Sequence, residues 1–465
     1  MSEPLERLLA GTASFFASEG DHQKACTHLL AGLLNLGRHT ITGTLTTAGR
    51  QHHDWSAQYR ALQRLPTEPL YGYLQEQTLA RTEGPWVIAV DDSAMRKTGR
   101  KIPGCGWRRD PLSPAFHVNF CWGQRVLQCS AAIPASDGSA RLVPIDWTEA
   151  PLPKKPAPRA SKEEWSNYQE ARRQANLNQV TLQRFAHLRT KTDRPIHFVV
   201  DGRFTNRTVL RGLPEATVVI GRIRKDTKLY AIGERQAGGG RPRRYGAVQP
   251  TPEQLRVDHK TPWQPVRAFA AEAEHLFKIK CTEPVMARIR GVSAPVRVIV
   301  IAPLGYRLRR GGRILYRQPA YLLCTDPDLP LERVLQQYLW RWDIEVNFRD
   351  EKCLLGVSEA QLRNPHAVRR QPAAAVAAYA VLLLAAHDAY GHNGQPPSVP
   401  LPRWRQRQPP RRPTTSRLLS QLRIELWSHC LRQSSLSQLR SSSLPHQNSD
   451  KLQPNLPPAV FYARN

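Results

Sequence analysis

The chain has 465 residues, 40% of them hydrophobic, which is enough for a sizeable core and for more than one structural unit. Its 67 Lys and Arg against 38 Asp and Glu give a formal net charge of +29. Such a chain repels itself unless it meets a polyanion, so nucleic acid is the leading expected partner. A ribosome-associated protein and a membrane-surface protein are the weaker alternatives.

The cysteines and the apolar segments point to a soluble protein of a reducing compartment. The eight cysteines form no C-x-x-C pair and no Cys/His cluster with zinc spacing. The N-terminus has early acidic residues and lacks the basic region of a signal peptide. The longest apolar run, 373–386, is shorter than the ~20 residues that span a bilayer. We therefore expect a buried core helix that starts at Pro372, no membrane contact, and a cytoplasmic protein.

Residues 1–84 are expected to form a helical unit. The apolar stretch 28–37 ends at Gly37, and two further short helical segments follow with glycine-marked turns. This spacing is compatible with a helix-turn-helix-like unit that recognises a DNA site. A plain helical cap on the next domain explains it equally well.

From residue 85 the apolar pattern changes from helical to strand-like. We expect a first α/β part over 85–215 and a β-rich part over 216–328. Helices should return over 329–390. The expected elements are strands at 86–92, at 117–134 (two strands with a turn at Gly123), at 197–202 and, several of them, within 217–326, and one long helix at 161–188.

Residues 391–465 differ in composition from the rest of the chain. They are rich in Pro, Arg, Ser and Gln and poor in residues that build a core. We expect this tail to be extended and partly disordered, with a short helix at 415–432.

One stretch, YLWRWDIEVNFRDEK at 338–352, gathers charged and aromatic side chains on one predicted helix face. Tyr338, Arg341, Glu345 and Lys352 fall within about 60° of one another at ~100° per residue. A mixed-charge solvated face explains such a pattern when it stands alone. Here it does not stand alone, because two other acids occupy unusual positions.

Asp91 and Asp201 each follow an apolar predicted strand. An acid in such a place costs desolvation energy unless it is paired or binds a cation. Two strand-end aspartates and the carboxylate of Glu345 would form a hard-oxygen site of the kind that Mg²⁺ prefers. Arg341 and Lys352 could then hold phosphates that the acids would repel, and Tyr338 could stack or hydrogen-bond near the backbone.

In these motifs the chain resembles a group of bacterial insertion-sequence transposases, the DDE transposases with a Y-x2-R-x3-E-x6-K signature. The matching segments, within about 25–390, are VDDS at 90–93, VVDGRFTN at 199–206, the four signature residues Tyr338, Arg341, Glu345 and Lys352, and the stretches GRHTITGTL, IGRIRKDTKLY and GGGRPRRYG. The resemblance implies an α/β fold with a ribonuclease H-like catalytic core that a β-rich insertion interrupts.

The resemblance also implies roles for single residues. Asp91, Asp201 and Glu345 would be the catalytic, metal-binding triad, with Mg²⁺ as the cofactor and Mn²⁺ able to substitute. The neighbouring Asp92 is the alternative for the first position, although the Asp-x-Ser spacing favours Asp91. Asp201 and Glu345 are 144 positions apart, too far for a minimal core, which agrees with an insertion between them.

Three further features carry weaker signals. Lys97 follows the first aspartates and could hold a phosphate, or could belong to a solvated loop. Arg241 and Arg243 lie in a Gly-Arg-Pro sequence that resembles an AT-hook, whose arginines fit a narrow A·T minor groove. A flexible basic loop is the simpler reading. Of Trp340 and Trp342, one could stack on an unpaired base, but the helix register favours a core position for the other.

The sequence thus predicts a metal-dependent transposase that cuts at terminal inverted repeats and joins the ends to target DNA. We expect a homodimer on DNA, no nucleotide cofactor, and association with the bacterial nucleoid. Two rival interpretations remain: a DNA-binding protein that no longer cuts, such as a repressor, and a structure-selective endonuclease that does not join. A glycosidase could use two carboxylates but would leave the +29 charge unexplained.

Overall fold

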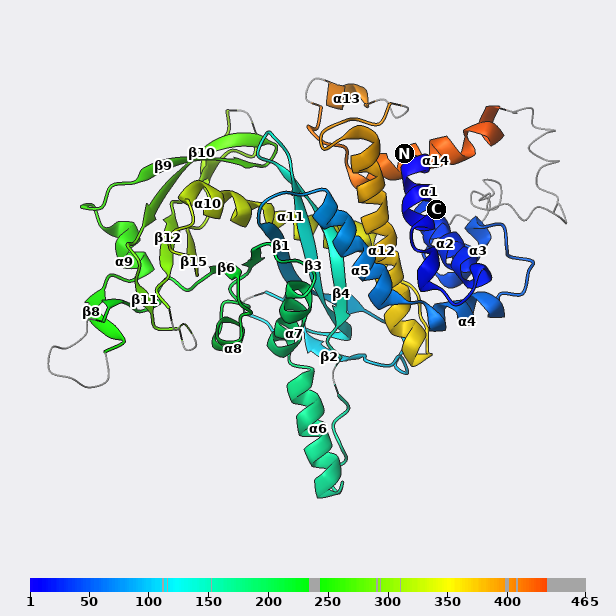
Figure 1. Cartoon of the computed structure of the whole chain (residues 1–465), viewed down its shortest axis with the longest axis horizontal. Helices are drawn as coiled ribbons and strands as arrows, with labels where there is room; N and C mark the ends of the chain where they lie inside the picture. Colours follow the sequence, from blue (N-terminus) through cyan, green and yellow to red (C-terminus); the bar gives the residue numbers. More distant parts are fainter. Residues whose placement is uncertain are drawn as a thin grey trace.

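A computed structural model describes most of the chain as one large mixed sheet with helices packed around it (Figure 1). The described residues are 1–110, 113–114, 116–151, 153–233, 243–289, 292, 294–309, 311–397, 401–406 and 409–432, with the backbone alone at 428–432.

Five strands toward one end of the sheet position the predicted site. They run in the order β4-β3-β1-β5-β6; β1 and β4 are antiparallel to β3, β5 is parallel to β1, and β6 is parallel to β5. A short strand, β2, pairs antiparallel with the first residues of β3. Their bounds are β1 Trp86–Arg96, β2 Gly106–Arg109, β3 Phe120–Pro134, β4 Ala140–Glu149, β5 Ile196–Val200 and β6 Thr217–Arg222.

The strands after β6 continue the same sheet. β15 pairs with β6, and β12, β10 and β9 follow outward, all antiparallel. Two small sheets, β11-β7-β8 and β13-β14, lie beside this extension. The bounds are β7 Leu229–Ile232, β8 Tyr245–Gln249, α9 Pro252–Val257, β9 Gln264–Ala270, β10 Ala273–Cys281, β11 Met286–Ala287, β12 Arg297–Ile301, β13 Gly305–Tyr306, β14 Leu315–Tyr316 and β15 Ala320–Cys324.

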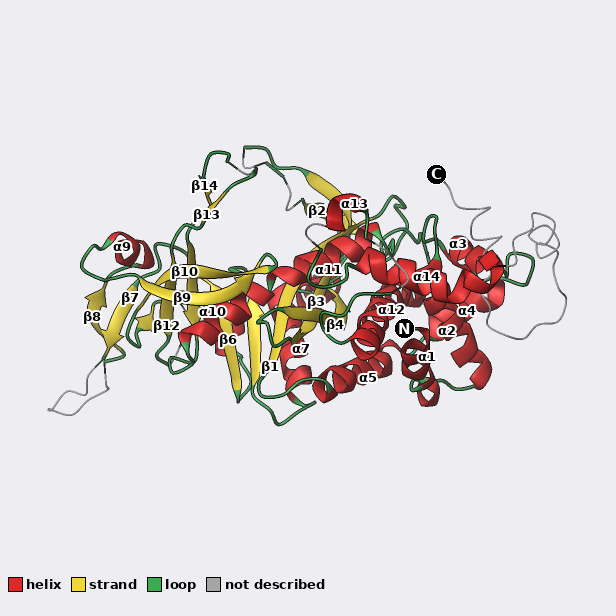
Figure 2. Cartoon of the chain, turned by 90° about the horizontal axis from the view of Figure 1, so that it is seen from above, coloured by secondary structure: helices red, strands yellow, loops and turns green. Residues whose placement is uncertain are grey.

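The N-terminal helices gather around one long helix, α12 Pro365–Tyr390, on the side opposite the sheet extension (Figure 2). α12 also packs on β4, so it joins this helical part to the sheet. The N-terminal elements are α1 Ser2–Ala10, the 3₁₀ turn η1 Ala13–Phe15, α2 Glu19–Leu34, α3 Ile41–Thr47, α4 Ser56–Arg64 and α5 Thr67–Ala80.

The start of α12 differs from the prediction. The helix begins at Pro365, and Pro372 lies inside it. The side chain of Asn364 accepts hydrogen bonds from the backbone N–H groups of His366 and Ala367, so an Asn cap with a proline at the first helical position sets the start. α12 is long and apolar enough to cross a membrane, but its apolar residues are mostly buried within the protein, as expected of a core helix.

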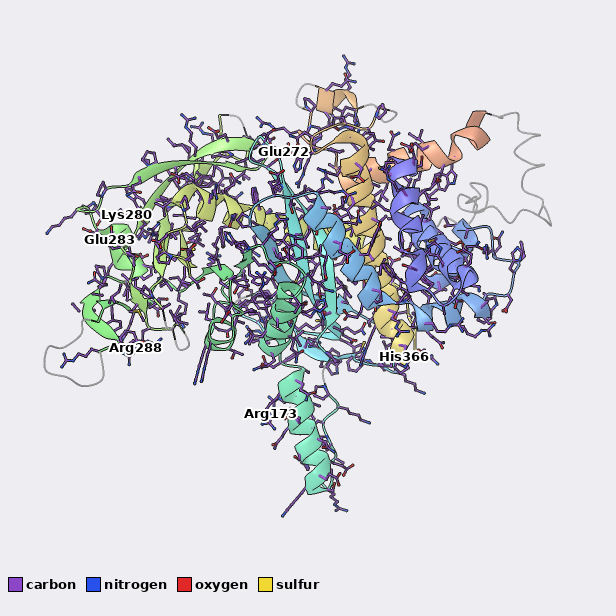
Figure 3. The ribbon with its side chains drawn as sticks, in the orientation of Figure 1. Arg173, Glu272, Lys280, Glu283, Arg288 and His366 are labelled. Atoms are coloured by element: carbon purple, nitrogen blue, oxygen red, sulfur yellow. The ribbon has the colours of Figure 1, made fainter. Side chains whose placement is uncertain are left out.

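The long helix predicted at 161–188 is interrupted. α6 spans Lys162–Gln174 with Ala175 as its C-cap, and Asn176 is the N-cap of α7 Leu177–Arg189. α7 packs on the sheet through buried residues, whereas α6 has none and projects away from the body, as the position of Arg173 shows (Figure 3). The cap at Asn176 is the local cause of the break. A short helix, α8 Arg207–Arg211, follows β5.

The C-terminal region is attached more closely than its composition suggests. The predicted helix is confirmed as α14 Thr415–Arg432, and Leu418 and Leu422 are fully buried against the helical part. Before it, α13 Arg403–Gln406 forms one short turn, and Arg412 pairs with Asp343 at 2.6 Å. Ion pairs and a buried apolar face therefore hold 409–427 to the body. Residues 433–465 lie outside the described residues.

Candidate functional site

Two aspartates meet at one edge of the sheet. β1 and β5 are parallel with Val90 opposite Val200, so Asp91 and Asp201 occupy equivalent positions one residue further on. Asp91 lies within β1, and Asp201 is the first residue after β5. The predicted meeting of the two acids therefore follows from the strand register.

A third acid comes from the helices that cross this edge. α10 Leu331–Trp340 and α11 Trp342–Cys353 meet at Arg341. Arg341 keeps right-handed helical angles, but its N–H bonds to the carbonyl of Tyr338, three residues back. The single helix that the sequence predicts is thus two helices with a tight turn between them. The turn still leaves Arg341 in contact with both Tyr338 and Glu345.

Arg341 lies at the centre of the site. Its Nη1 is 3.0 Å from Asp91 Oδ2, and its Nη2 is 3.3 Å from Glu345 Oε1. Burial disfavours the charged guanidinium, but attraction to Asp91, Tyr338, Glu345 and Asp201 outweighs burial, and the pKa of Arg341 is raised. One partly buried cation therefore forms ion pairs with Asp91 and Glu345 and is attracted electrostatically by Asp201.

Asp91 has an unusually weak acid group. Burial raises its pKa to about 7; Arg341 opposes this shift, and repulsion by Asp201 adds to it. Its Oδ1 also accepts a hydrogen bond from the backbone N–H of Asp92 at 2.8 Å. A carboxyl that is this costly to ionise beside a second acid is typical of a site that takes up an extra cation.

Asp92 has a different environment from its neighbour. Its Oδ2 accepts from Arg125 Nε at 2.8 Å, and its Oδ1 lies 3.5 Å from Arg203 Nη1. Asp92 is thus paired with two guanidiniums and Asp91 with one, and the choice of Asp91 as the ligand at the first position stays a prediction. Neither arginine was singled out from the sequence, since their nearness depends on the pairing of β3 with β1 and on the loop after β5.

Lys352 joins α11 to the first motif. Its Nζ donates to Ser93 Oγ at 2.6 Å, so the serine two residues after Asp91 has a defined partner. Burial lowers the pKa of Lys352, with a smaller opposing effect from Glu351. The ammonium is therefore fixed next to Ser93, two residues after Asp91 on β1, and a phosphate contact of Lys352 stays a prediction.

The two tryptophans of the signature separate as the register predicts. Trp340 is partly buried, and its Nε1 donates to the carbonyl of Gly138 at 2.9 Å. The side chain of Trp342 is 60% exposed. Trp342 is thus the one available for stacking.

Two predicted phosphate-binding residues, Lys97 and Arg243, do not join this cluster. Lys97 is buried, and its Nζ donates to the carbonyls of Ser358 and Ala360, both at 2.9 Å. The structure thus uses the charge of Lys97 inside the protein, and a phosphate contact stays a prediction. Arg243 is exposed just before β8, at the far end of the sheet extension (Figure 1). Arg241 lies outside the described residues.

The three predicted carboxylates are of the ligand type that suits a hard divalent cation, although they are not arranged as a metal cluster. Within the described part of the chain, no three His, Cys, Asp or Glu side chains are close enough to form a metal cluster. Arg341 contacts both Asp91 and Glu345 and supplies the positive charge there. The carboxylates of Asp91, Asp201 and Glu345 are nevertheless the ligand type that Mg²⁺ prefers.

A comparison with protein families places this region in a known family. The family model described as DDE superfamily endonuclease matches residues 15–273, more than half of the chain. The matched region contains Asp91 and Asp201 and ends before Glu345. No curated protein matches the sequence.

Proposed function

We propose that this chain, which belongs to the DDE superfamily of endonucleases, is a transposase that cuts DNA at the ends of its own element and joins them to target DNA. Membership of the family implies DNA as the substrate and divalent metal ions as cofactors. The observation that carries the proposal is the interaction of Arg341 with Asp91, Glu345 and Asp201 at one edge of the sheet. The finer assignment to the group with the Y-x2-R-x3-E-x6-K signature rests on Tyr338, Arg341, Glu345 and Lys352.

The strand order supports a ribonuclease H-like core. Three antiparallel strands, β4-β3-β1, followed by the parallel strands β5 and β6, fit such a core, with acids on β1 and directly after β5. The segment from β7 to β15 would be the insertion, and α10, α11 and α12 would complete the core. In this arrangement the insertion extends the catalytic sheet.

Asp91, Asp201 and Glu345 would hold Mg²⁺ or, in its place, Mn²⁺. Two such ions would activate a water or a 3′-hydroxyl and stabilise the leaving oxygen of the phosphodiester. Arg341 would keep the acids neutralised in the metal-free protein. When a divalent cation neutralises the acids instead, the planar guanidinium of Arg341 would be free to bind a DNA phosphate.

The remaining partners follow from the charge and from the chemistry. The net charge of +29 would bind the phosphate backbone, and Lys352, which donates to Ser93 in the first motif, would be one of the contacting cations. The helices of residues 1–84 would read the terminal inverted repeats. Two ends must be brought together, so a homodimer on DNA is proposed, in the cytoplasm and at the nucleoid. Exchange of one phosphodiester for another needs no nucleotide cofactor.

A nuclease that cuts without joining is the second candidate, because the matched family is described by its endonuclease activity alone. A strand-transfer assay separates the two: a transposase attaches the freed 3′ ends to a target duplex, and a nuclease leaves them free. A DNA-binding repressor that has lost cutting is the least favoured, because all three acids are present and interact with Arg341.

The test uses DNA that spans the gene and both flanks, incubated with the full-length protein and Mg²⁺ or Mn²⁺. New 3′-hydroxyl ends are mapped to the nucleotide. Glu345→Gln should bind this DNA and leave it uncut, while the control Glu332→Gln, at an exposed acid on α10, should cut as wild type does. Cuts at paired inverted repeats support the transposase, and wild-type binding without any cut would overturn it.

A further inference from the structure

The acid on the inner side of α11, Glu351, is not used by the proposed chemistry. It is 0% exposed, and among the described residues neither of its carboxylate oxygens has a hydrogen-bond partner. An ionised carboxylate that is buried without a donor is strongly unfavourable. A neutral carboxylic acid in the same place needs only an acceptor for its proton.

A second buried group, an acceptor without a donor, belongs to the same hydrogen-bond network. Gln128 on β3 is 0% exposed, and its Oε1 has no donor among the described residues. The other end of that amide, Nε2, donates to Ser130 Oγ at 3.2 Å. An O–H on Glu351 would therefore satisfy both orphaned groups with one hydrogen bond.

The surrounding hydrogen bonds connect Glu351 and Gln128 to α11, which carries Glu345, and to the strands next to Asp91. Asn347, one turn before Glu351 on α11, donates to Ser130 Oγ at 3.3 Å and to the carbonyl of Leu142 at 3.1 Å. Gln128 is the cross-strand partner of Asp91. The buried amides and the acid thus connect the helix of Glu345 with the strands of Asp91.

We propose that Glu351 is a positioning residue: as a neutral acid hydrogen-bonded to Gln128, it fixes α11 against β3 and so sets Glu345 relative to Asp91. The role concerns the same site and rests on the proposed function. Glu351 itself touches neither DNA nor a metal ion in this account. Its effect comes from the place at which α11 is held.

The charged and titratable neighbours leave Glu351 in the neutral form. Asp350 is paired with Arg349 and accepts from Thr415 Oγ1 at 2.6 Å, and Lys352 donates to Ser93. On the packed helices, the hydroxyl of Tyr71 donates to the carbonyl of Ala373, and that of Tyr379 interacts with Thr415. Burial is the main cause that raises the pKa of Glu351 to about 8; Gln128 and Lys352 oppose the shift, and Asp350 adds to it.

Four variants of the full-length protein test the role through the pH profile of Mg²⁺-dependent cleavage. Glu351→Gln can donate to Gln128 at every pH, so it should cut within about twofold of wild type at pH 7 and keep its rate at pH 9, where wild type declines. Glu351→Leu should lose about tenfold or more in kcat with unchanged DNA affinity, because misplacement by ~1 Å can cost about 10²-fold. Gln128→Leu should behave similarly.

The double variant Glu351→Leu/Gln128→Leu separates positioning from a general loss of packing. Replacing both partners leaves no orphaned polar group, so it should cut faster than Gln128→Leu alone. Additive losses in the double variant would overturn the proposal. An alkaline decline in Glu351→Gln equal to that of wild type would also overturn it.

Failure of the proposed function is detected separately. Thermal unfolding of the metal-free protein between pH 5 and 9 needs no DNA and no activity. If Glu351 is the neutral acid, Glu351→Gln removes a pH dependence of Tm that the control Asp350→Asn retains. If Glu351→Gln loses the pH dependence of Tm but wild type cuts no DNA, the transposase function is rejected and the hydrogen bond between Glu351 and Gln128 is kept. If the Tm of wild type and of Glu351→Gln depends equally on pH, that hydrogen bond is rejected.

Discussion

The two faces of α11 use acidic residues in opposite ways. On the outer face Glu345, 41% exposed, lies beside Arg341 at the edge where Asp91 and Asp201 meet. On the inner face Glu351 is fully buried, and neither of its carboxylate oxygens has a hydrogen-bond partner among the described residues. The same side chain therefore serves as a charge on one face and as a neutral hydrogen-bond donor on the other. The different surroundings of the two glutamates, rather than the residue type, therefore give Glu345 a place in the reaction site and Glu351 a positioning role.

The largest expected effect tests the outer face through two adjacent aspartates. Asp91→Asn should lower cleavage by at least about 10²-fold, the scale for loss of one electrostatic contributor at a reacting centre. Asp92→Asn should cut within about tenfold of wild type and lose about 2 kcal/mol of unfolding free energy, because its charged hydrogen bond to Arg125 is weakened. Cleavage rates and denaturant unfolding are measured for both variants. A large loss of cleavage in Asp92→Asn with little loss in Asp91→Asn would make Asp92 the metal ligand.

A smaller loss is expected at Arg341. Arg341→Ala should reduce cleavage by about 10- to 100-fold, the range for residues that orient metal ligands. Arg341→Lys keeps the charge but loses the planar fork that contacts Asp91 and Glu345 together, so it should recover little of the rate. Single-turnover cleavage at saturating Mg²⁺ measures both. Full activity of the alanine variant would remove Arg341 from the site.

The inner face predicts a pH dependence of stability. Glu351 has a pKa of about 8 in the folded protein, against an ordinary value of 4.5. Between these values the folded chain keeps a proton that the unfolded chain releases, so the favourable contribution is complete below pH 4.5 and is lost as pH rises through 8. The slope for one proton is about −1.4 kcal/mol per pH unit, and Glu351→Gln should remove it. Urea unfolding at several pH values measures the slope.

The smallest expected effect concerns Lys352. Lys352→Met should weaken DNA binding about equally for all sequences and lower the salt dependence of binding by about one counterion. Loss of the 2.6 Å hydrogen bond to Ser93 should also loosen α11 slightly. Binding isotherms at several salt concentrations check this. An unchanged salt slope would place Lys352 away from the phosphates.

Much of the site could be predicted because it depends on strand ends and helix spacing. The apolar runs before Asp91 and Asp201 predicted two strands whose acids could form a cluster; the parallel pairing of β1 and β5, and the continuation of β1 to Arg96, appear only in the structure. The spacing of Tyr338, Arg341 and Glu345 predicted one helix face, and their contacts survive the turn at Arg341.

What the sequence could not reveal depends on contacts between distant segments. Lys97 looked like a loop cation, but its ammonium binds the carbonyls of Ser358 and Ala360, more than 260 positions away. Glu351 looked like one charge among many in 338–352, and only the folded packing around α11 makes it a buried acid. The pairing of Asp92 with Arg125 likewise requires the register of β1 and β3.

The most direct test puts the two faces of α11 in one assay. Mg²⁺-dependent cleavage of DNA that carries the element's ends is measured for wild type, Glu345→Gln and Glu351→Gln at pH 7. We predict that wild type and Glu351→Gln cut at similar rates, and that Glu345→Gln binds the DNA without cutting. Cleavage by Glu345→Gln at the wild-type rate would contradict the assignment of the outer face to the chemistry.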